Sequence, residues 1–220
     1  MSKSYESFNP RTQYCLDHST PLNKHVDELM EVSLACKSGQ MTGAKGVLQT
    51  CATLIEIIQA KNILDIGFFT GVSALTWATI IPEDGKVISM DVDDAPYKIV
   101  GKPHIDASGV GHKIDIRIQP ALKTLQELID AGQSGKFDFA FLDASKTEYP
   151  SYLASCLQLV RTGGIIAVDN ALWDDRVLEK EKDTSTAGVD TLNKMALSNS
   201  NVQNVLLPIE DGLHLIVKKC

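Results

Sequence analysis

The spacing of hydrophobic positions changes along the chain, and the first part has a helical period. Leu22, Val26, Leu29 and Leu34 recur at roughly helical spacing with charged residues between them. This pattern predicts a helix over about residues 21–37, with Gly39 as a stop signal. A second helix is predicted over about residues 44–60. Its apolar positions are Val47, Leu48, Leu54, Ile55, Ile57 and Ile58.

From residue 62 onward, short apolar runs alternate with helical patterns. The runs predict strands at about 62–67, 86–91, 113–118, 137–143 and 164–170. Helical patterns lie between them, at about 71–80, 96–108, 122–129 and 152–160. Strands that are apolar through their centres and alternate with helices indicate a parallel sheet covered on both faces.

The end of the chain has a different pattern. Two extended runs, 202–208 and 213–218, are joined by Ile209-Glu-Asp-Gly212, which is a hairpin signal. One terminal strand is therefore expected to run antiparallel to the others. The full expectation is an α/β fold with a seven-stranded, mostly parallel sheet, helices on both faces and extra N-terminal helices.

Composition narrows the class of protein. The 220 residues include 21 basic and 28 acidic side chains, so the net charge is 21 − 28 = −7. The length suits a single domain, interpreted as a helical extension over 1–40 and an α/β core over 41–220. The acidic balance weighs against nucleic acid as a partner. We expect no membrane segment, no secretory signal at Met1–Phe8 and a cytoplasmic protein with reduced thiols, because the five cysteines form no paired motif.

Acidic side chains end four of the predicted parallel strands. They are Asp65, Asp91, Asp143 and the pair Asp169-Asn170. The carboxyl ends of parallel strands meet at one edge of the sheet, where ligands bind. Carboxylates gathered there repel one another unless a cation or hydrogen-bond donors offset their charge. The alternative is that each Asp caps the helix that follows it.

The segment Gly67-Phe-Phe-Thr-Gly71 follows the first predicted strand. It is neither a GxGxxG fingerprint nor a phosphate-binding loop, because no Gly-Lys-Ser/Thr follows. Asp91, about 20 residues further on, stands where an acid can accept hydrogen bonds from ribose hydroxyls. Together they favour a nucleoside without a polyphosphate, such as S-adenosylmethionine, with Asp65 facing its ammonium group and Ser73 its carboxylate. An NAD-dependent dehydrogenase is disfavoured by the missing fingerprint.

Several collinear segments resemble one family. The segments are Asp65–Ser73, Ile81–Lys86, Phe137–Lys146, Gly163–Trp173 and Leu207–Leu213. Over about residues 40–218 the sequence resembles the cation-dependent O-methyltransferases of the caffeoyl-CoA and catechol type. The resemblance implies the Rossmann-like class I methyltransferase fold, S-adenosylmethionine as the cofactor and a homodimer.

The resemblance also implies roles for individual residues. Asp143, Asp169 and Asn170 match divalent-metal ligands, and their oxygen atoms suit Mg²⁺, with Ca²⁺ or Mn²⁺ as alternatives. Lys146 matches a general base, beside Asp143 as a second catalytic residue; the alternative for Lys146 is a solvated surface lysine. Trp173 is expected either to flank a substrate ring or to pack in the core. The residues that match cofactor contacts are Met41, Gly43, Asp65, Gly67, Phe69, Ser73, Asp91, Ala121 and Asp143.

The function predicted from these residues is methyl transfer from S-adenosylmethionine to one hydroxyl of a small vicinal aromatic diol, of the catechol, caffeoyl or flavonoid type. A metal would chelate both oxygens and polarise the hydroxyl. Two alternatives stay open: an O-methyltransferase acting on hydroxyuridine in tRNA, and a non-catalytic relative that binds S-adenosylmethionine. The charged segment 174–188 is predicted to be a solvated loop, with a lid over the acceptor as the alternative.

Overall fold

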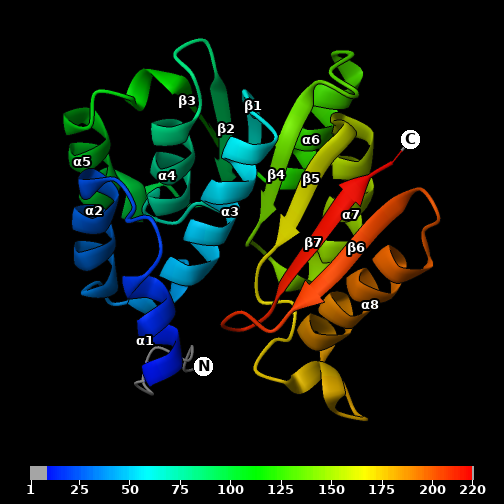
Figure 1. Cartoon of the computed structure of the whole chain (residues 1–220). Helices are drawn as coiled ribbons and strands as arrows, with labels where there is room; N and C mark the ends of the chain where they lie inside the picture. The colour runs from blue at the N-terminus through cyan, green and yellow to red at the C-terminus, as the bar shows by residue number, and fades with distance from the viewer. Residues whose placement is uncertain (1–8, 220) are drawn as a thin grey trace.

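Seven strands form a single sheet in the order β3-β2-β1-β4-β5-β7-β6 (Figure 1). The computed structural model describes residues 9–219, so Met1–Phe8 and Cys220, for which the sequence also carries expectations, lie outside it. The strands are β1 Asn62–Ile66, β2 Lys86–Asp91, β3 Ile114–Ile118, β4 Phe137–Leu142, β5 Val160–Val168, β6 Val202–Leu207 and β7 Leu213–Lys218. Strand β7 pairs antiparallel with both β5 and β6, and the pairs among β1 to β5 are parallel. The predicted fold class is confirmed.

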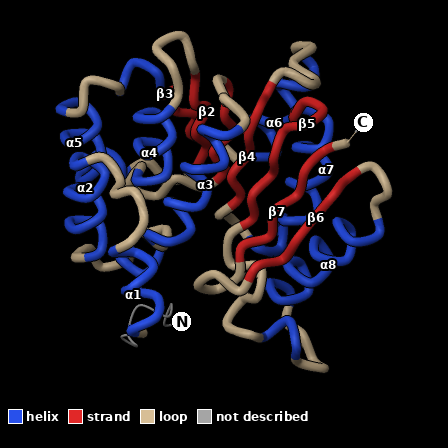
Figure 2. Tube along the Cα trace, viewed as in Figure 1, coloured by secondary structure: helices blue, strands red, loops and turns tan. Residues whose placement is uncertain are grey.

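Helices cover both faces of the sheet (Figure 2). The helices are α1 Pro10–Asp17, α2 Lys24–Leu34, α3 Lys45–Ile57, α4 Val72–Ile80, α5 Lys102–Ala107, α6 Ala121–Asp130, α7 Tyr149–Leu159 and α8 Thr184–Ser198. Short helical turns lie at 39–41, 97–101, 111–113, 146–148 and 176–178. Side chains of α2 to α5 pack on one face of the sheet, and those of α6 to α8 pack on the other.

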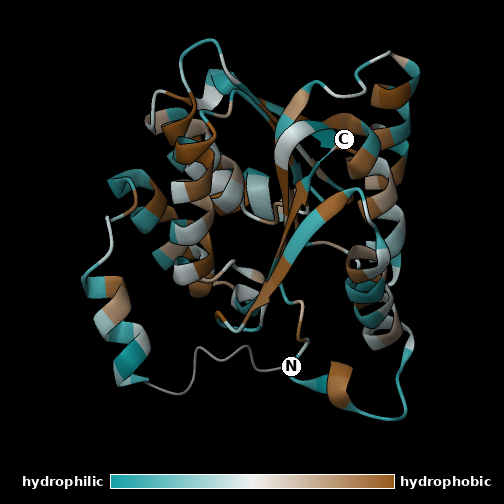
Figure 3. Cartoon of the chain, turned by 45° about the vertical axis from the view of Figure 1, so that its right-hand side comes forward, coloured by the Kyte–Doolittle hydropathy of each residue, from teal (hydrophilic) through white to brown (hydrophobic). Residues whose placement is uncertain are grey.

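Alternation along the strands separates these two cores. On β1, Ile63 faces the α2–α5 side, whereas Leu64 and Ile66 face the α6–α8 side. This is the period of two that a strand imposes on its side chains. Figure 3 shows hydrophobic residues concentrated on the strands and on the helix sides turned toward the sheet. Asp65, which lies between apolar neighbours on β1, is therefore carried into the interior.

Two helices were not anticipated from the sequence. Helix α8 begins at Thr184, inside the segment predicted to be a solvated loop, where Asp183 caps it by accepting from the Thr186 amide at 2.8 Å. Its first buried residues, Thr186 and Gly188, are small or polar, and the apolar spacing begins only with Val189, Leu192 and Ala196. Helix α1 has no buried side chain at all and thus no hydrophobic stripe.

Other boundaries shift by a few residues. The helix predicted over 21–37 is limited to α2, where Asn23 accepts from the His25 amide at 3.0 Å and so caps the start. The helix predicted over 96–108 begins with a π-helical turn at 97–101. In the described residues no helix is long and apolar enough to cross a membrane. Cys15, Cys36, Cys51 and Cys156 carry free thiols.

Candidate functional site

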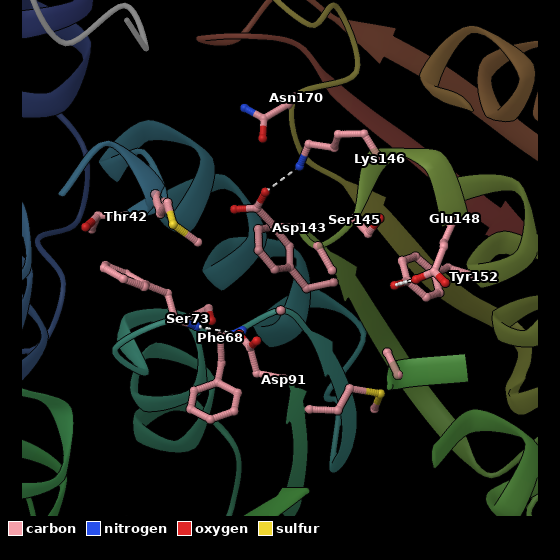
Figure 4. Close-up of a pocket in the computed structure, with 18 of the residues that line it drawn as sticks. Thr42, Phe68, Ser73, Asp91, Asp143, Ser145, Lys146, Glu148, Tyr152 and Asn170 are labelled. Atoms are coloured by element: carbon pink, nitrogen blue, oxygen red, sulfur yellow. Dashed lines mark hydrogen bonds and ion pairs between the residues drawn. The ribbon is translucent and has the colours of Figure 1, made fainter. Parts of the chain in front are cut away.

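A cavity of about 770 Å³ opens at the carboxyl ends of β1, β2, β4 and β5. Its walls include the predicted residues Met41, Gly43, Gly67, Phe69, Ser73, Asp91, Ala121, Asp143, Lys146, Asn170 and Trp173. Figure 4 shows Asp143, Lys146 and Asn170 grouped together, with Asp91 nearer to Phe68 and Ser73. Two predicted site residues, Asp65 and Asp169, are not among the residues that line it.

Gly67 brings the loop after β1 against the chain that follows β4. Its φ is +86°, and a Cβ atom at this position would lie 2.3 Å from the carbonyl oxygen of Asp143. No side chain fits at that distance, and the left-handed conformation itself favours glycine. Gly67 thereby permits the backbone after β1 and the backbone at Asp143 to meet in one wall of the cavity.

Asp91 organises the same loop from the end of β2. One oxygen of its carboxylate, Oδ2, accepts from the amides of Phe68 at 3.2 Å and Phe69 at 3.1 Å. The other, Oδ1, accepts from the Val92 amide at 2.7 Å. A carboxylate offers about four acceptor positions. The Asp93 amide also donates to Oδ1, at 3.4 Å, so four backbone amides point at this carboxylate and hold the loop in place.

The structure corrects the assignment of Asp65 as a direct cofactor contact. Its side chain is fully buried behind the cavity wall. There Trp77 Nε1 donates to Oδ1 at 3.0 Å, and the hydroxyls of Ser73 and Ser89 donate to Oδ2 at 3.1 and 2.9 Å. Burial raises the pKa of this carboxyl to about 7, although the three hydrogen bonds act in the opposite direction. Asp65 reaches the cavity through Ser73, whose hydroxyl it holds.

Asp143, Asp169 and Asn170 follow the ends of two adjacent strands. Leu142 on β4 and Val168 on β5 are register partners, so the residues after them stand side by side. Asp169 is 2% exposed and its Oδ1 accepts from the Asn170 amide at 2.9 Å. Asn170 is 3% exposed and has a φ of +55°, a conformation that Asn tolerates better than most residues. The register thus places the three residues at one edge of the sheet, as their strand-end positions predict, and their role as metal ligands stays a prediction.

The electrostatics of this edge are negative. The charges of Asp143 and Asp169 add to burial in raising the pKa of the Tyr149 hydroxyl. Asp169 likewise adds to burial in raising the pKa of the Cys51 thiol. The donor set consists of two carboxylates and one amide oxygen, which fits a hard divalent cation and not a zinc site built from His and Cys.

Lys146 is part of this cluster. Its Nζ lies 2.7 Å from Asp143 Oδ1 and 2.7 Å from the Tyr149 hydroxyl, which itself donates to the Asp169 carbonyl at 3.0 Å. Lys146 is 8% exposed, so the alternative of a solvated surface lysine is wrong. The turn that carries it follows β4 directly, which fixes the amine next to the strand ends.

Helix α8 supports Lys146 from behind. A Cβ atom at Gly188 would lie 2.2 Å from the Lys146 carbonyl oxygen. The absence of a side chain at this position allows α8 to pack directly on the backbone that carries Lys146. The helix left out by the sequence interpretation therefore helps to position a predicted catalytic residue.

The loop after β5 forms another wall. Trp173, Asp174 and Asp175 have φ values of 52°, 53° and 60°, a run of left-handed residues without glycine. The Asp174 amide donates to Asp211 Oδ1 at 2.7 Å, which holds this conformation. Trp173 lines the cavity with its ring centroid 5.4 Å from Lys146 Nζ, and it also packs against the core cluster under α7 and α8. Both roles predicted for Trp173 are thus compatible with its position.

Three residues that line the cavity were not predicted from the sequence to have a function: Glu148, Asp174 and Asp211. Glu148 accepts a short hydrogen bond from Tyr152, which also lines the cavity. Their spacing of four residues across the start of α7 is a signal for such a pair. Asp211 sits in the β6–β7 hairpin turn, where an acidic residue is ordinary, and its pKa is raised by burial and by the charge of Asp174. Nothing in the local sequence marks Asp211 as part of a site.

Comparisons with known proteins agree with this geometry. Residues 16–219 match a family model described as O-methyltransferase. The chain is 40% identical to catechol O-methyltransferase domain-containing protein 1 of Mus musculus, over 96% of this chain and 80% of the relative. It is 37% identical to caffeoyl-CoA O-methyltransferase 1 of Eucalyptus globulus, over 86% and 80% respectively. An O-methyltransferase from Bacillus cereus, solved in complex with SAH, shares the fold with a TM-score of 0.86 at 24% identity, covering 97% of this chain and 99% of that one.

Proposed function

Because the chain belongs to the O-methyltransferase family, we propose that it transfers the methyl group of S-adenosylmethionine to one hydroxyl of a vicinal aromatic diol held by a divalent cation. The observation that carries the proposal is the shape of the site. One cavity joins Asp91, an acceptor suited to ribose hydroxyls, to the oxygen-rich edge at Asp143 and Asn170. A nucleoside and a second substrate would therefore share one cavity.

The cofactor end is built for a nucleoside without phosphates. Asp91 accepts from the ribose hydroxyls, and the Ser73 hydroxyl, fixed by Asp65, faces the amino-acid part. Gly67 lets the loop after β1 meet the backbone at Asp143, so that both line this end. No lysine or arginine lies among the described residues that line this end, which favours a cofactor without a polyphosphate.

Asp143, Asp169 and Asn170 would hold the cation. Their two carboxylates and one amide oxygen are typical ligands of Mg²⁺, and the neighbouring strand ends place them together. A bound divalent cation supplies Lewis-acid polarisation, which lowers the pKa of the diol hydroxyl. Asp169 turns one oxygen toward the Asn170 amide, so it also fixes the backbone of its neighbour.

Lys146 is the residue that receives the proton. Its amine stands within hydrogen-bond distance of Asp143 and Tyr149, which limit its movement. In its neutral form it accepts the hydroxyl proton as the oxygen attacks the methyl carbon. The reaction breaks a sulfur–carbon bond, forms an oxygen–carbon bond and releases S-adenosylhomocysteine. Trp173 flanks the flat acceptor ring.

The test is methyl transfer to 4-ethylcatechol, measured with Mg²⁺ and with EDTA. We expect turnover that requires the metal and falls by at least about a hundredfold in Asp169→Ala, because one charged ligand is lost. Asp175→Asn is the matched control, since Asp175 is exposed and does not line the cavity. Calorimetry with S-adenosylhomocysteine separates loss of cofactor binding from loss of chemistry. Full activity of Asp169→Ala in EDTA would contradict the metal-dependent mechanism.

The alternative proposal is that the methyl group goes to a hydroxyuridine in tRNA. Turnover of tRNA that carries hydroxyuridine, without turnover of any diol, would favour it. We further propose a homodimer, which light scattering after size-exclusion chromatography tests directly. A single species with the mass of one chain, 24.0 kDa, would contradict the dimer.

A further inference from the structure

The acceptor end of the cavity, at Lys146, has two further carboxylates. Asp174 and Asp211 line the cavity beside Trp173, whose ring centroid lies 5.4 Å from Lys146 Nζ, and the Asp174 amide donates to Asp211. Among the described lining residues Lys146 is the single cation, and its ammonium is already paired with Asp143 at 2.7 Å. Apart from Lys146 and the divalent cation proposed at Asp143, the charged groups at the acceptor end are carboxylates.

Nearby basic side chains offset this charge only in part: Arg176 interacts electrostatically with Asp174, and Lys146 with Asp211. Arg176 is paired with Asp183 at 2.6 Å, and Lys182 donates to the Glu179 carbonyl at 2.6 Å and lies 3.7 Å from Asp190. Neither Arg176 nor Lys182 lines the cavity. In the part of the chain that the structure describes, no arginine faces the cavity to receive a phosphate or a carboxylate.

The position of Asp174 is imposed by the fold. Its left-handed backbone is flanked by Trp173 and Asp175 in the same conformation, which is costly for residues other than glycine. The hydrogen bond from its amide to Asp211 Oδ1 holds it there, and the Leu172 amide donates to the Asp211 carbonyl at 2.9 Å. The loop therefore keeps two carboxylates at the acceptor end at a cost in backbone strain.

We propose that Asp174, supported by Asp211, makes the enzyme select diol acceptors that carry a positive charge on the substituent remote from the hydroxyls. Carboxylate acceptors and acyl-CoA thioesters, which bear negative charge at that position, are disfavoured. This inference rests on the proposed function, because it assigns a substrate class to the same cavity. A cationic diol differs from caffeoyl-CoA, the acceptor in the name of the Eucalyptus globulus relative.

Three diols of similar size that differ chiefly in charge test the selectivity. They are 3,4-dihydroxyphenethylamine, 4-ethylcatechol and 3,4-dihydroxyphenylacetate, with caffeoyl-CoA as a fourth acceptor. For each we would measure kcat/KM with Mg²⁺ at low and high salt, relative to the value for the neutral diol in the same variant. We expect the amine to exceed the carboxylate by about tenfold or more at low salt. The ratio should decline with added salt because exposed charges are screened.

Asp174→Asn is the decisive variant, and Asp175→Asn is its matched control. Both residues are exposed, and asparagine tolerates the left-handed backbone of each, so the two variants differ mainly in whether the lost charge faces the cavity. We expect Asp174→Asn to lower the amine-to-carboxylate ratio about two- to fivefold, the range for an exposed charge pair. Asp175→Asn should leave the ratio at the wild-type value.

Each outcome decides between the two proposals. Preference of the wild type for the carboxylate or the thioester overturns the selectivity, as does an equal change in both variants. Binding of the four acceptors is also measured by calorimetry, with S-adenosylhomocysteine and Mg²⁺ present. If they bind in the expected order but none is methylated, the proposed reaction fails while the selectivity stands. If the neutral diol is methylated and charge has no effect, the reaction stands and the selectivity fails.

Discussion

The carboxylate of Asp65 accepts a hydrogen bond from Trp77 Nε1 at 3.0 Å, and both side chains are fully buried. Trp77 packs against Phe139 and Phe141, with ring centroids 5.8 and 5.3 Å away. An acidic group is thus enclosed in an aromatic layer directly beneath the Ser73 hydroxyl. Burial is the largest cause that moves its pKa to about 7.

This carboxyl should make stability depend on pH. Its pKa is about 7 in the folded protein and 3.8 as the ordinary value. Between these values the folded state holds a proton that the unfolded state has lost, so the free energy of unfolding falls as pH rises through this range. From pH 5 to pH 8 we expect a loss on the order of 2–3 kcal/mol in urea unfolding of the wild type.

Asp65→Asn should remove this loss. The amide oxygen can accept from Trp77, and the amide nitrogen can donate to the hydroxyl oxygens of Ser73 and Ser89, so the new side chain keeps a hydrogen bond with each of the three residues. The wild type and the variant should therefore diverge in stability as pH rises. An equal decline in both proteins would show that another group is responsible.

Lys146→Arg should reduce turnover. Arginine retains the positive charge beside Asp143 but stays protonated, so it does not accept the hydroxyl proton. We expect kcat to fall by about a hundredfold or more, in line with the loss of a general base, with little change in the Kd for S-adenosylhomocysteine. The rising limb of the pH–rate profile should change as well. Wild-type kcat in this variant would mean that Lys146 is not the base.

Gly67→Ala should destabilise the site far more than Gly132→Ala. Both glycines have positive φ, 86° and 71°, so the two variants share the conformational cost of about 1–2 kcal/mol. Only at Gly67 would the new methyl group meet backbone, at 2.3 Å from the Asp143 oxygen, whereas nothing lies within 4 Å at Gly132. Thermal unfolding and the Kd for S-adenosylhomocysteine should separate them, and equal effects would argue against the contact.

Asp91→Ala should weaken cofactor binding by at least about tenfold. The variant loses the ribose acceptor and leaves the Phe68 and Phe69 amides without their partner, at a cost of about 1–3 kcal/mol. Asp93→Ala is the control, since Asp93 accepts only a local bond from Ala95 and does not line the cavity. Calorimetry with S-adenosylhomocysteine measures both. Unchanged affinity in Asp91→Ala would remove Asp91 from the proposed cofactor site.

The strand ends were predictable from sequence because two local signals agree there. A short apolar run identifies a buried strand, and the polar residue after it marks the sheet edge, as at Asp91, Asp143 and Asp169. Parallel pairing then brings these positions together without further information. The hairpin was predictable for a similar reason, because its turn residues lie between two extended runs.

The remaining parts depend on contacts between distant segments. Asp65 obeys the strand-end pattern but is drawn inward by Trp77 and by Ser89 on the next strand, a set of donors that no local spacing specifies. Asp211 reaches the site because the hairpin turn docks on the loop after β5. Helix α8 was not predicted because the buried positions of its first turns are Thr186 and Gly188, which give no apolar signal, and its apolar positions begin only at Val189.

Gly188 shows what close packing implies for sequence change in this protein. Glycine inside a helix is about 1 kcal/mol less favourable than alanine. Helix propensity alone would therefore favour alanine at position 188. Here the replacement would push a methyl group into the Lys146 carbonyl, 42 positions earlier in the chain. A substitution chosen to strengthen α8 would thus disturb the backbone that carries Lys146, a residue of the proposed site. Thermostabilisation of this protein should leave position 188 unchanged.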